Sequence, residues 1–304
     1  MELALMTEPQ LGGTYQDLLD AARWAEDNGF VALARSDHYY WSGGPADAND
    51  AFTTFGGIAR ETSTIRLVVL VSPLTFRHPA VIAKAAASLD EMSGGRFDLG
   101  LGTGWMEMEH EVFGLPFPDW SERFERLEEA LPYVRAALRD EHATFAGKHY
   151  RIDASVRPLA PSVGLVVGGS GPKRTPRLAG RWADEYNAFT ALPEVLAPRI
   201  SELRRSAEEH GRDPSAIRVS VMGGGFWGED EAAYREELAE GAAKRGLEPS
   251  AFEAQLAERG ALHGPVDRVR EQLAGLEAVG VDRWYVQVIP HDLENVQRVA
   301  GPLV

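Results

Sequence analysis

The sequence predicts an α/β fold, a closed (β/α)8 TIM barrel with insertion segments, and two observations carry this prediction. Apolar strand-like runs and amphipathic helical segments alternate about eight times along the 304 residues, which favours a barrel. No GxGxxG motif follows the first expected strand, where an open dinucleotide-binding sheet would place one. An open, doubly wound sheet is therefore the less favoured alternative. We expect a single domain spanning residues 1–304.

The composition restricts the partners of the chain. A net charge of -15 opposes binding to nucleic acid or to an acidic membrane, so we expect a small-molecule substrate and neither of those partners. There is no cysteine, which excludes disulfides, thiolate zinc sites and a cysteine nucleophile. No signal-like segment is visible and no apolar run approaches ~18 residues, so we expect a cytoplasmic protein without a membrane span.

The first expected elements lead to a strand that ends in polar residues. Residues 2–6 read as an apolar strand, and Thr14, with Asp17 three residues later, is typical of a helix start. That helix extends to an Asn-Gly pair, which is followed by a strand at 31–34 and a helix at 50–62.

The clearest unit is a strand at 67–71, a helix at 79–92 and a strand at 96–101. Both strands lack polar alternation, as expected in a sheet that is covered on both faces. The helix carries one apolar stripe and begins at Pro79, whose missing N–H suits a first turn. These three segments predict a βαβ unit.

The rest of the chain continues the alternation. A hairpin around Gly147 is expected at 144–152 as an insertion before the next barrel strand. The other expected strands lie at 165–167, 185–189, 217–222 and 284–288, and the helices at 121–138, 175–182, 193–210, 231–245 and 265–279.

Polar and aromatic residues follow the second strand, where ligands bind in parallel α/β folds. His38 has an ordinary pKa near ~6.5 and so exchanges a proton at neutral pH. Asp37 beside it would hydrogen-bond a cofactor ring or tune the histidine. The alternative is an aspartate that caps a turn, next to a histidine bonded to backbone. The sequence leaves both interpretations open.

A glycine-rich run from Gly168 to Gly171 separates an expected strand from an expected helix. Small residues let backbone N–H groups approach an anion, the positive helix end favours it, and Lys173 adds charge. The run therefore predicts a phosphate site. The alternative is an ordinary tight turn, although the run is longer than such a turn needs.

The strand at 96–101 is followed by a second candidate surface. Thr103 and Gly104 would let a flat ring lie against the backbone, with Trp105 as a wall; a core tryptophan is the alternative. The acidic run that follows is typical of a solvated helix start. Within it, Glu109 is a candidate proton-handling group.

Other chemistry has less support. For Arg77 we expect a structural role in which it reaches backbone carbonyls or Asp90. No third ligand with metal spacing lies near His38, so we expect no metal site. No serine lies in a GxSxG motif, which argues against a hydrolase nucleophile.

Three blocks occur together in this sequence: Ser36-Asp37-His38, VSPLTFRHPAVIAKAAASLDEMSGGRFDLGLGTGW at residues 71–105, and VVGGSGPKRTPRLAGRWADEYN at 166–187. Together they resemble the luciferase-like monooxygenase superfamily, and within it the oxidoreductases that use the deazaflavin coenzyme F420. The resemblance covers most of the first two-thirds of the chain and is weak afterwards.

The resemblance implies a barrel that binds F420 with its ring at the carboxyl ends of the strands. Asp37 would contact the coenzyme, and His38 would be the proton donor. Thr103 and Gly104 would touch the ring or its tail. A stretch that bulges in relatives, often with a non-prolyl cis peptide, would support one ring face through Val69, Leu70 and Ser72. The phosphate would be held by Gly168, Gly169, Ser170, Gly171 and Pro172.

One position departs from the sugar-phosphate dehydrogenases of this branch. In them a glutamate that takes part in proton transfer follows the glycine aligned with Gly104, whereas this chain has Trp105. The departure argues against oxidation of glucose 6-phosphate and leaves the partner of His38 unassigned.

The activity implied is hydride transfer between F420 and an unidentified small organic substrate, with His38 moving the proton. Two alternatives stay open: an FMN-dependent monooxygenase that works with a separate reductase, and a flavin- or deazaflavin-binding protein without catalysis. The resemblance also implies a homodimer. Aromatic or glycine-rich loops at 39–49, 115–121 and 223–228 would shape the substrate site.

Overall fold

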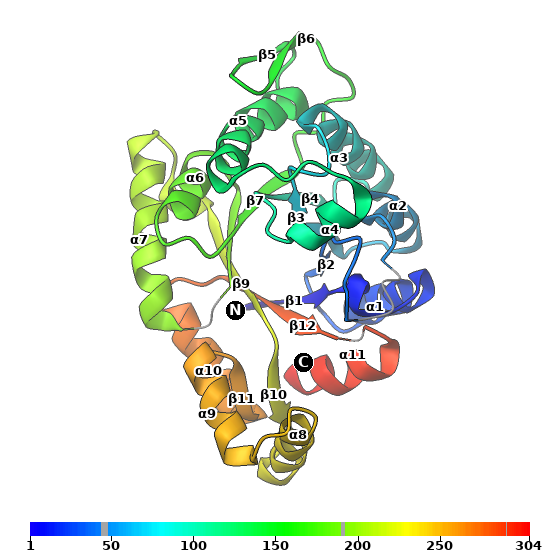
Figure 1. Cartoon of the computed structure of the whole chain (residues 1–304), viewed down its shortest axis with the longest axis vertical. Coiled ribbons are helices and arrows are strands. Elements are labelled where there is room, and N and C mark those ends of the chain that lie inside the picture. Colours follow the sequence, from blue (N-terminus) through cyan, green and yellow to red (C-terminus); the bar gives the residue numbers. More distant parts are fainter. Residues whose placement is uncertain (44–47, 190–191, 290) are drawn as a thin grey trace.

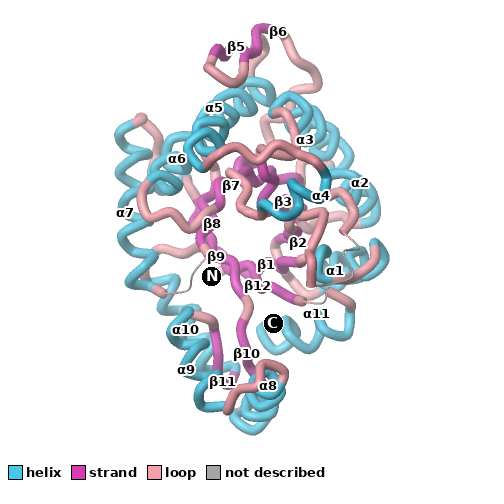
Figure 2. Tube along the Cα trace, viewed as in Figure 1, coloured by secondary structure: helices cyan, strands magenta, loops and turns pink. Residues whose placement is uncertain are grey.

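Eight parallel strands close into a barrel in the computed structural model, which describes residues 1–43, 48–189, 192–289 and 291–304. The barrel strands are β1 (Glu2–Thr7), β2 (Ala32–Arg35), β3 (Arg66–Pro73), β4 (Phe97–Gly102), β7 (Gly164–Gly168), β8 (Glu185–Ala188), β9 (Arg218–Gly223) and β12 (Arg283–Val288). Their order around the barrel is β1, β12, β9, β8, β7, β4, β3, β2. Helices surround this ring (Figures 1 and 2). The predicted barrel is confirmed, and the open sheet is excluded.

The helices follow the strands as the sequence predicts, with a few additions. They are α1 (Tyr15–Asp27), α2 (Ala51–Glu61), α3 (Pro79–Ser93), α4 (Glu107–Phe113), α5 (Trp120–Arg139), α6 (Arg174–Trp182), α7 (Pro193–Glu209), α8 (Glu231–Ala243), α9 (Pro249–Arg259), α10 (Val266–Ala278) and α11 (Leu293–Ala300). Short 3-10 helices lie at Pro9–Leu11, Pro214–Ala216 and Gly301–Leu303. Within the described ranges, no helix combines the length and the apolar character that crossing a membrane requires.

The helix starts have the local causes that the sequence indicates. The Thr14 hydroxyl accepts the Asp17 N–H, and the Asp17 carboxylate accepts the Thr14 N–H, so the two residues form a capping box for α1. Helix α2 begins after Asp50, whose side chain accepts the Thr53 N–H. Helix α3 begins at Pro79, as predicted.

Apolar side chains pack on both faces of the barrel wall. The outward faces of the strands join the main core beneath the helices, as Leu33 and Val286 do. The inward faces form a smaller core, which consists of Ala4, Met6, Ala32, Ala34, Val68, Leu70, Val166 and Tyr285. Because successive side chains alternate between these two buried faces, the strands read as nearly continuous apolar runs.

Strand β3 bulges near its carboxyl end. Its register with β4 shifts between Val69 and Ser72, and the peptide bond from Leu70 to Val71 is cis, as the resemblance implied. The Val71 side chain packs against the inner core. Glycines make room for it: a Cβ on Gly102 would lie 2.7 Å from a Val71 methyl group, and Gly100 and Gly168 face the same side chain.

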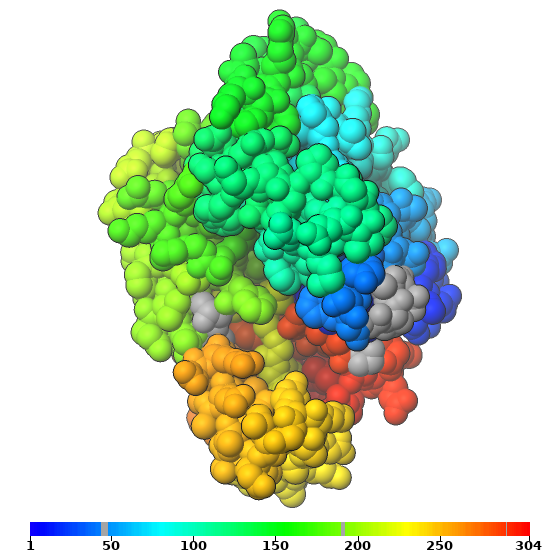
Figure 3. All heavy atoms as spheres, in the orientation of Figure 1, coloured from blue at the N-terminus to red at the C-terminus, as the bar shows by residue number. Residues whose placement is uncertain are grey.

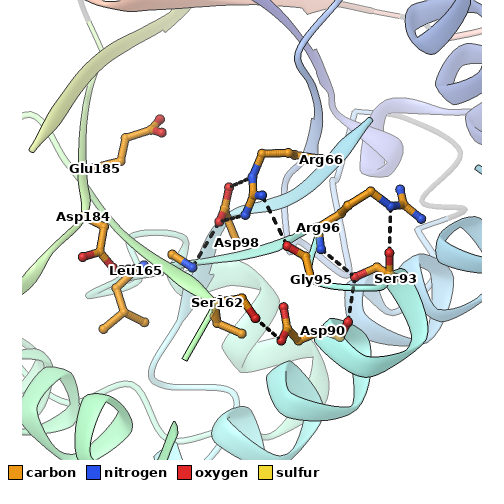
Figure 4. Close-up of polar contacts among 12 residues, drawn as sticks. Arg66, Asp90, Ser93, Gly95, Arg96, Asp98, Ser162, Leu165, Asp184 and Glu185 are labelled. Atoms are coloured by element: carbon orange, nitrogen blue, oxygen red, sulfur yellow. Dashed lines mark hydrogen bonds and ion pairs between the residues drawn. The ribbon is translucent and has the colours of Figure 1, made fainter. Parts of the chain in front are cut away.

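Charged pairs fill the barrel at the amino ends of the strands. Arg66, the first residue of β3, donates from Nε to Asp98 Oδ2 of β4 at 2.8 Å (Figure 4). Arg283 of β12 donates to Glu185 of β8 at 3.0 Å, and both side chains are at most 3% exposed. Pairing offsets the cost of burying these charges. The carboxyl ends of the strands remain as the face for a ligand.

Two additions extend the barrel at opposite ends of Figure 1. The antiparallel hairpin β5 (Ala143–Ala146) and β6 (Arg151–Ala154) lies where the sequence predicts it. A parallel pair, β10 (Gly225–Gly228) and β11 (Leu262–Pro265), lies next to α8 and α9 (Figure 2). The expectation of a loop over residues 223–228 is therefore wrong. Four-residue strands rich in glycine contain no apolar run by which the sequence would predict them.

Candidate functional site

A histidine and a glutamate from distant parts of the chain meet at the carboxyl ends of the strands. His38 follows β2 and Glu109 lies in the first turn of α4. His38 Nδ1 lies 2.9 Å from Glu109 Oε1, and the Tyr39 N–H donates to the other carboxylate oxygen at 3.1 Å. The Glu109 side chain is only 1% exposed. The expectation of a solvated acidic run is thus wrong for Glu109, which is buried beside His38.

The charge of Glu109 acts directly on His38. Burial alone would lower the pKa of His38, but the hydrogen bond and charge of Glu109, with the charges of Glu8 and Asp37, raise it above its ordinary value. Because the carboxylate accepts at Nδ1, the neutral histidine keeps its proton there and leaves Nε2 as the proton acceptor. Among the described residues, Nε2 has no hydrogen-bond partner.

The Asp37 side chain points elsewhere. Arg77 donates to both of its carboxylate oxygens, and Arg77 also bonds Asp50 and the Tyr39 hydroxyl. Burial would raise the pKa of Asp50, but the Thr53 N–H and Arg77 lower it to about 2. Arg77 therefore ties the loop after β2 to the loop after β3. The contact between Asp37 and the coenzyme stays a prediction.

The expected partner of Arg77 was wrong. Asp90 accepts a hydrogen bond from the Ser162 hydroxyl instead, as Figure 4 shows. Arg77 precedes α3, whereas Asp90 lies near the end of that helix, so the length of the helix separates them.

The bulge supplies the predicted residues on β3. Val69 packs outward into the main core and Leu70 inward, both buried. Ser72 is fully buried, and its hydroxyl accepts a 3.3 Å hydrogen bond from Arg77. A ring above this segment would therefore meet the backbone of the bulge and Val71 rather than the Ser72 hydroxyl.

The loop after β4 forms the next part of the barrel mouth, the end of the barrel where the strands have their carboxyl ends. Gly104 has φ of 77°, and a Cβ there would lie 2.9 Å from the Thr75 hydroxyl, so only glycine fits without strain. Thr103 beside it is partly exposed. The alternative of a core tryptophan is wrong: Trp105 is 66% exposed, and its ring meets the His38 ring edge-on, with centroids 5.7 Å apart.

The glycine-rich loop leads into a helix without a side-chain cap. Lys173 occupies the N-cap position of α6 and makes no capping bond, so first-turn N–H groups stay available to an anion. A Cβ on Gly171 would lie 3.0 Å from the Thr175 hydroxyl, so the loop packs closely on that first turn. The loop consists of Gly168, Gly169, Ser170, Gly171 and Pro172, which are partly or well exposed.

One buried polar group, around Glu8, was not predicted from the sequence. Glu8 is 8% exposed, and its carboxylate oxygens accept from Gln10 Nε2 at 2.7 Å and from Gln287 Nε2 at 2.9 Å. The Ser36 hydroxyl donates to Gln10 at 2.7 Å. Counting by twos from Ala4 and Met6, which face inward, would have placed Glu8 in the barrel mouth.

The predicted residues thus lie in or after the carboxyl-terminal parts of β2, β3, β4 and β7, which are neighbours in the barrel, or in α4. Figure 3 shows this face of the molecule hollowed near its centre. The first loop expected to shape the substrate includes residues 44–47, which lie outside the described residues.

Curated relatives match much of the chain. This chain is 37% identical over 207 residues to the F420-dependent glucose-6-phosphate dehydrogenase of Nakamurella multipartita. The matched stretch covers 64% of this chain and 59% of that relative. The chain is 32% identical over 289 residues to the protein of the same name from Kineococcus radiotolerans, over 91% of this chain and 81% of the relative.

Solved structures share the fold over the whole chain. An F420-dependent secondary alcohol dehydrogenase in complex with an F420-acetone adduct has a TM-score of 0.79 at 19% identity and covers 100% of this chain and 99% of its own. A coenzyme F420 dependent tetrahydromethanopterin reductase from Methanopyrus kandleri has a TM-score of 0.77 at 20% identity, over 98% and 96%. The family model described as luciferase-like monooxygenase matches residues 2–283. This chain therefore belongs to the luciferase-like monooxygenase family.

Proposed function

We propose that this protein is an F420-dependent oxidoreductase that transfers a hydride between the deazaflavin and a small organic substrate, with His38 and Glu109 handling the proton. The observation that carries the proposal is the 2.9 Å contact between these two side chains at the barrel mouth. Relatives named as F420-dependent support the choice of coenzyme, one of them over 91% of the chain.

The residues present fit such a coenzyme. A phosphate would accept hydrogen bonds from the uncapped first turn of α6 and from the backbone of residues 168–172. A flat ring would lie along the bulge of β3 and beside Gly104, where a Cβ is absent. When bound, the coenzyme supplies the hydride chemistry, and the protein orients it.

In this proposal the side chains of the protein carry out the proton transfer. Glu109 fixes the His38 ring through Nδ1 and leaves Nε2 to give a proton to the substrate or to take one from it. The raised pKa of His38 keeps part of it protonated near neutral pH, so the same group serves as an acid or a base.

Parallel titrations with F420 and FMN, followed by fluorescence quenching, test the coenzyme. We expect saturable binding of F420 and at least about tenfold weaker binding of FMN. His38→Ala should bind F420 normally but oxidise reduced F420 about 10²- to 10⁴-fold more slowly with a panel of carbonyl compounds. Tighter binding of FMN would favour the monooxygenase, and binding without any turnover would favour a non-catalytic carrier.

We also propose that the protein is a homodimer, as the family resemblance implies, and that it is cytoplasmic. Light scattering on the purified protein should give twice the mass of the chain, and cell fractionation should recover the protein with the cytoplasm.

A further inference from the structure

We propose that the substrate is an uncharged, mostly apolar molecule that binds against Trp105, Phe189, Met222 and Ile289, here called the apolar wall, and that sugar phosphates and other anions are excluded. This inference rests on the proposed function, because it places the substrate beside His38. It concerns the selectivity of the site, which the coenzyme does not determine.

Strands β8 and β9 place two members of the wall side by side. On β8, Ala188 packs outward into the main core, and continuing the alternation one residue past the end of the strand would direct Phe189 inward. On β9, Met222 packs against the inner core. Ala188 pairs with Val221, and extending this register by one residue puts Phe189 next to Met222.

The neighbouring strand β12 adds the third member. Tyr285 lies in the inner core, and Gln287 points inward to Glu8. Continuing this alternation one residue past the end of β12 would direct Ile289 inward, one layer above Gln287. Trp105 reaches the mouth from the loop after β4, where its ring meets His38.

Three of these four side chains are exposed. Trp105 is 66% exposed, Phe189 59% and Ile289 43%, whereas the residues before the last two, Ala188 and Val288, are at most 1% exposed. Trp105, Phe189 and Ile289 follow strands β4, β8 and β12, so they stand on different sides of the barrel mouth, and exposed apolar surface around a polar centre is typical of a binding site. Covering it with an apolar molecule removes the surface from water and so favours binding.

The charges around the mouth disfavour an anion. Glu8 and Glu109 are buried carboxylates, and Glu8 receives only amide donors among the described residues. Two nearby arginines are already engaged: Arg77 holds Asp37 and Asp50, and Arg123 of α5 donates to the Gly104 carbonyl. A phosphate on the substrate would therefore meet buried carboxylates, while the charge of a protonated His38 is balanced by Glu109 and Lys173 flanks the phosphate loop.

A matched pair of small molecules tests the inference: 4-phenylbutan-2-one, which is neutral, and 4-phenylbutanoate, which has a similar shape and one negative charge. Calorimetry on the full chain loaded with oxidised F420 measures binding without turnover, and glucose 6-phosphate serves as a third probe. We expect the ketone to bind at least about tenfold more tightly than the carboxylate, and glucose 6-phosphate not to saturate.

Variants of the wall locate the site. Phe189→Asp and Ile289→Asp should each weaken ketone binding about tenfold and leave the affinity for F420 within about twofold. Met92→Ala is the control, because Met92 is also exposed but lies near the end of α3, far along the helix from the mouth. It should leave both affinities unchanged.

Several outcomes would overturn the inference: equal binding of ketone and carboxylate, saturable binding of glucose 6-phosphate, no ketone binding to the loaded protein, or wall variants that bind the ketone normally. Failure to bind F420 would instead overturn the proposed function. The two failures are therefore distinguishable.

Discussion

At the residue scale, the pairing of His38 with Glu109 is the centre of the candidate site. The sequence singled out both side chains as proton-handling candidates, but it did not pair them, because they are separated by 71 residues. Only the closed barrel brings the loop after β2 to helix α4. The neighbouring acid, Asp37, was the obvious partner by sequence, yet Arg77 holds it.

Replacing Glu109 by Gln tests this pairing. Glu109→Gln keeps an oxygen acceptor but removes the charge that raises the pKa of His38. We expect the pKa of His38 to fall below its wild-type value, as measured by NMR titration of the histidine ring protons. Glu107→Gln is the control, since Glu107 is exposed on the same helix and should leave the pKa unchanged. An unaltered pKa in Glu109→Gln would contradict the account.

The same pairing predicts how stability depends on pH. A group whose pKa is higher in the folded state stabilises most below its unfolded pKa, here ~6.5, and this contribution is lost as pH rises through the folded value. The stability advantage of wild type over Glu109→Gln should therefore shrink as pH rises above ~6.5. A constant or growing difference, measured by urea denaturation, would be inconsistent with the raised pKa.

At the element scale, the β3 bulge and the glycines around it form one packing unit. A Cβ on Gly100 would lie 2.2 Å from the Val69 carbonyl oxygen, a contact that no rotamer change relieves. The bulge could be predicted from the family resemblance. The fit of Val71 among three glycines could not, because it depends on strands that are neighbours only in the barrel.

Two glycine-to-alanine substitutions distinguish the effect of this close packing from the general effect of replacing a glycine. Gly100→Ala should lower the free energy of unfolding by about 1–3 kcal/mol, because the added methyl group overpacks the strand. Gly275→Ala is the control: Gly275 lies within α10 with nothing near its Cβ position, so alanine should raise the stability by up to about 1 kcal/mol. Urea denaturation measures both, and a Gly100→Ala protein as stable as wild type would contradict this packing.

The elements that the sequence missed share a physical cause. Strands β10 and β11 are four residues long, and the neighbouring helix α9 buries only Phe252 and Leu256. Their packing against one another, not their local sequence, determines them. The barrel strands were predictable because both of their faces are buried.

At the scale of the whole molecule, the closed barrel brings segments that are distant in the sequence together at one end. Alternating strands and helices predict the fold, and the fold places the carboxyl ends of the strands at one end, so sequence alone located the candidate residues. The polar group around Glu8 and the apolar wall were not predicted. Each depends on which strands are neighbours and on which way single side chains face.

The most direct measurement is a crystal structure of the protein with oxidised F420. The account predicts that the ring lies along the β3 bulge next to Gly104 and His38, with its phosphate at residues 168–172 and the first turn of α6. His38 Nε2 should face the open side of the ring, where a substrate would bind. A coenzyme bound outside the barrel mouth, or a ring out of reach of His38, would contradict it.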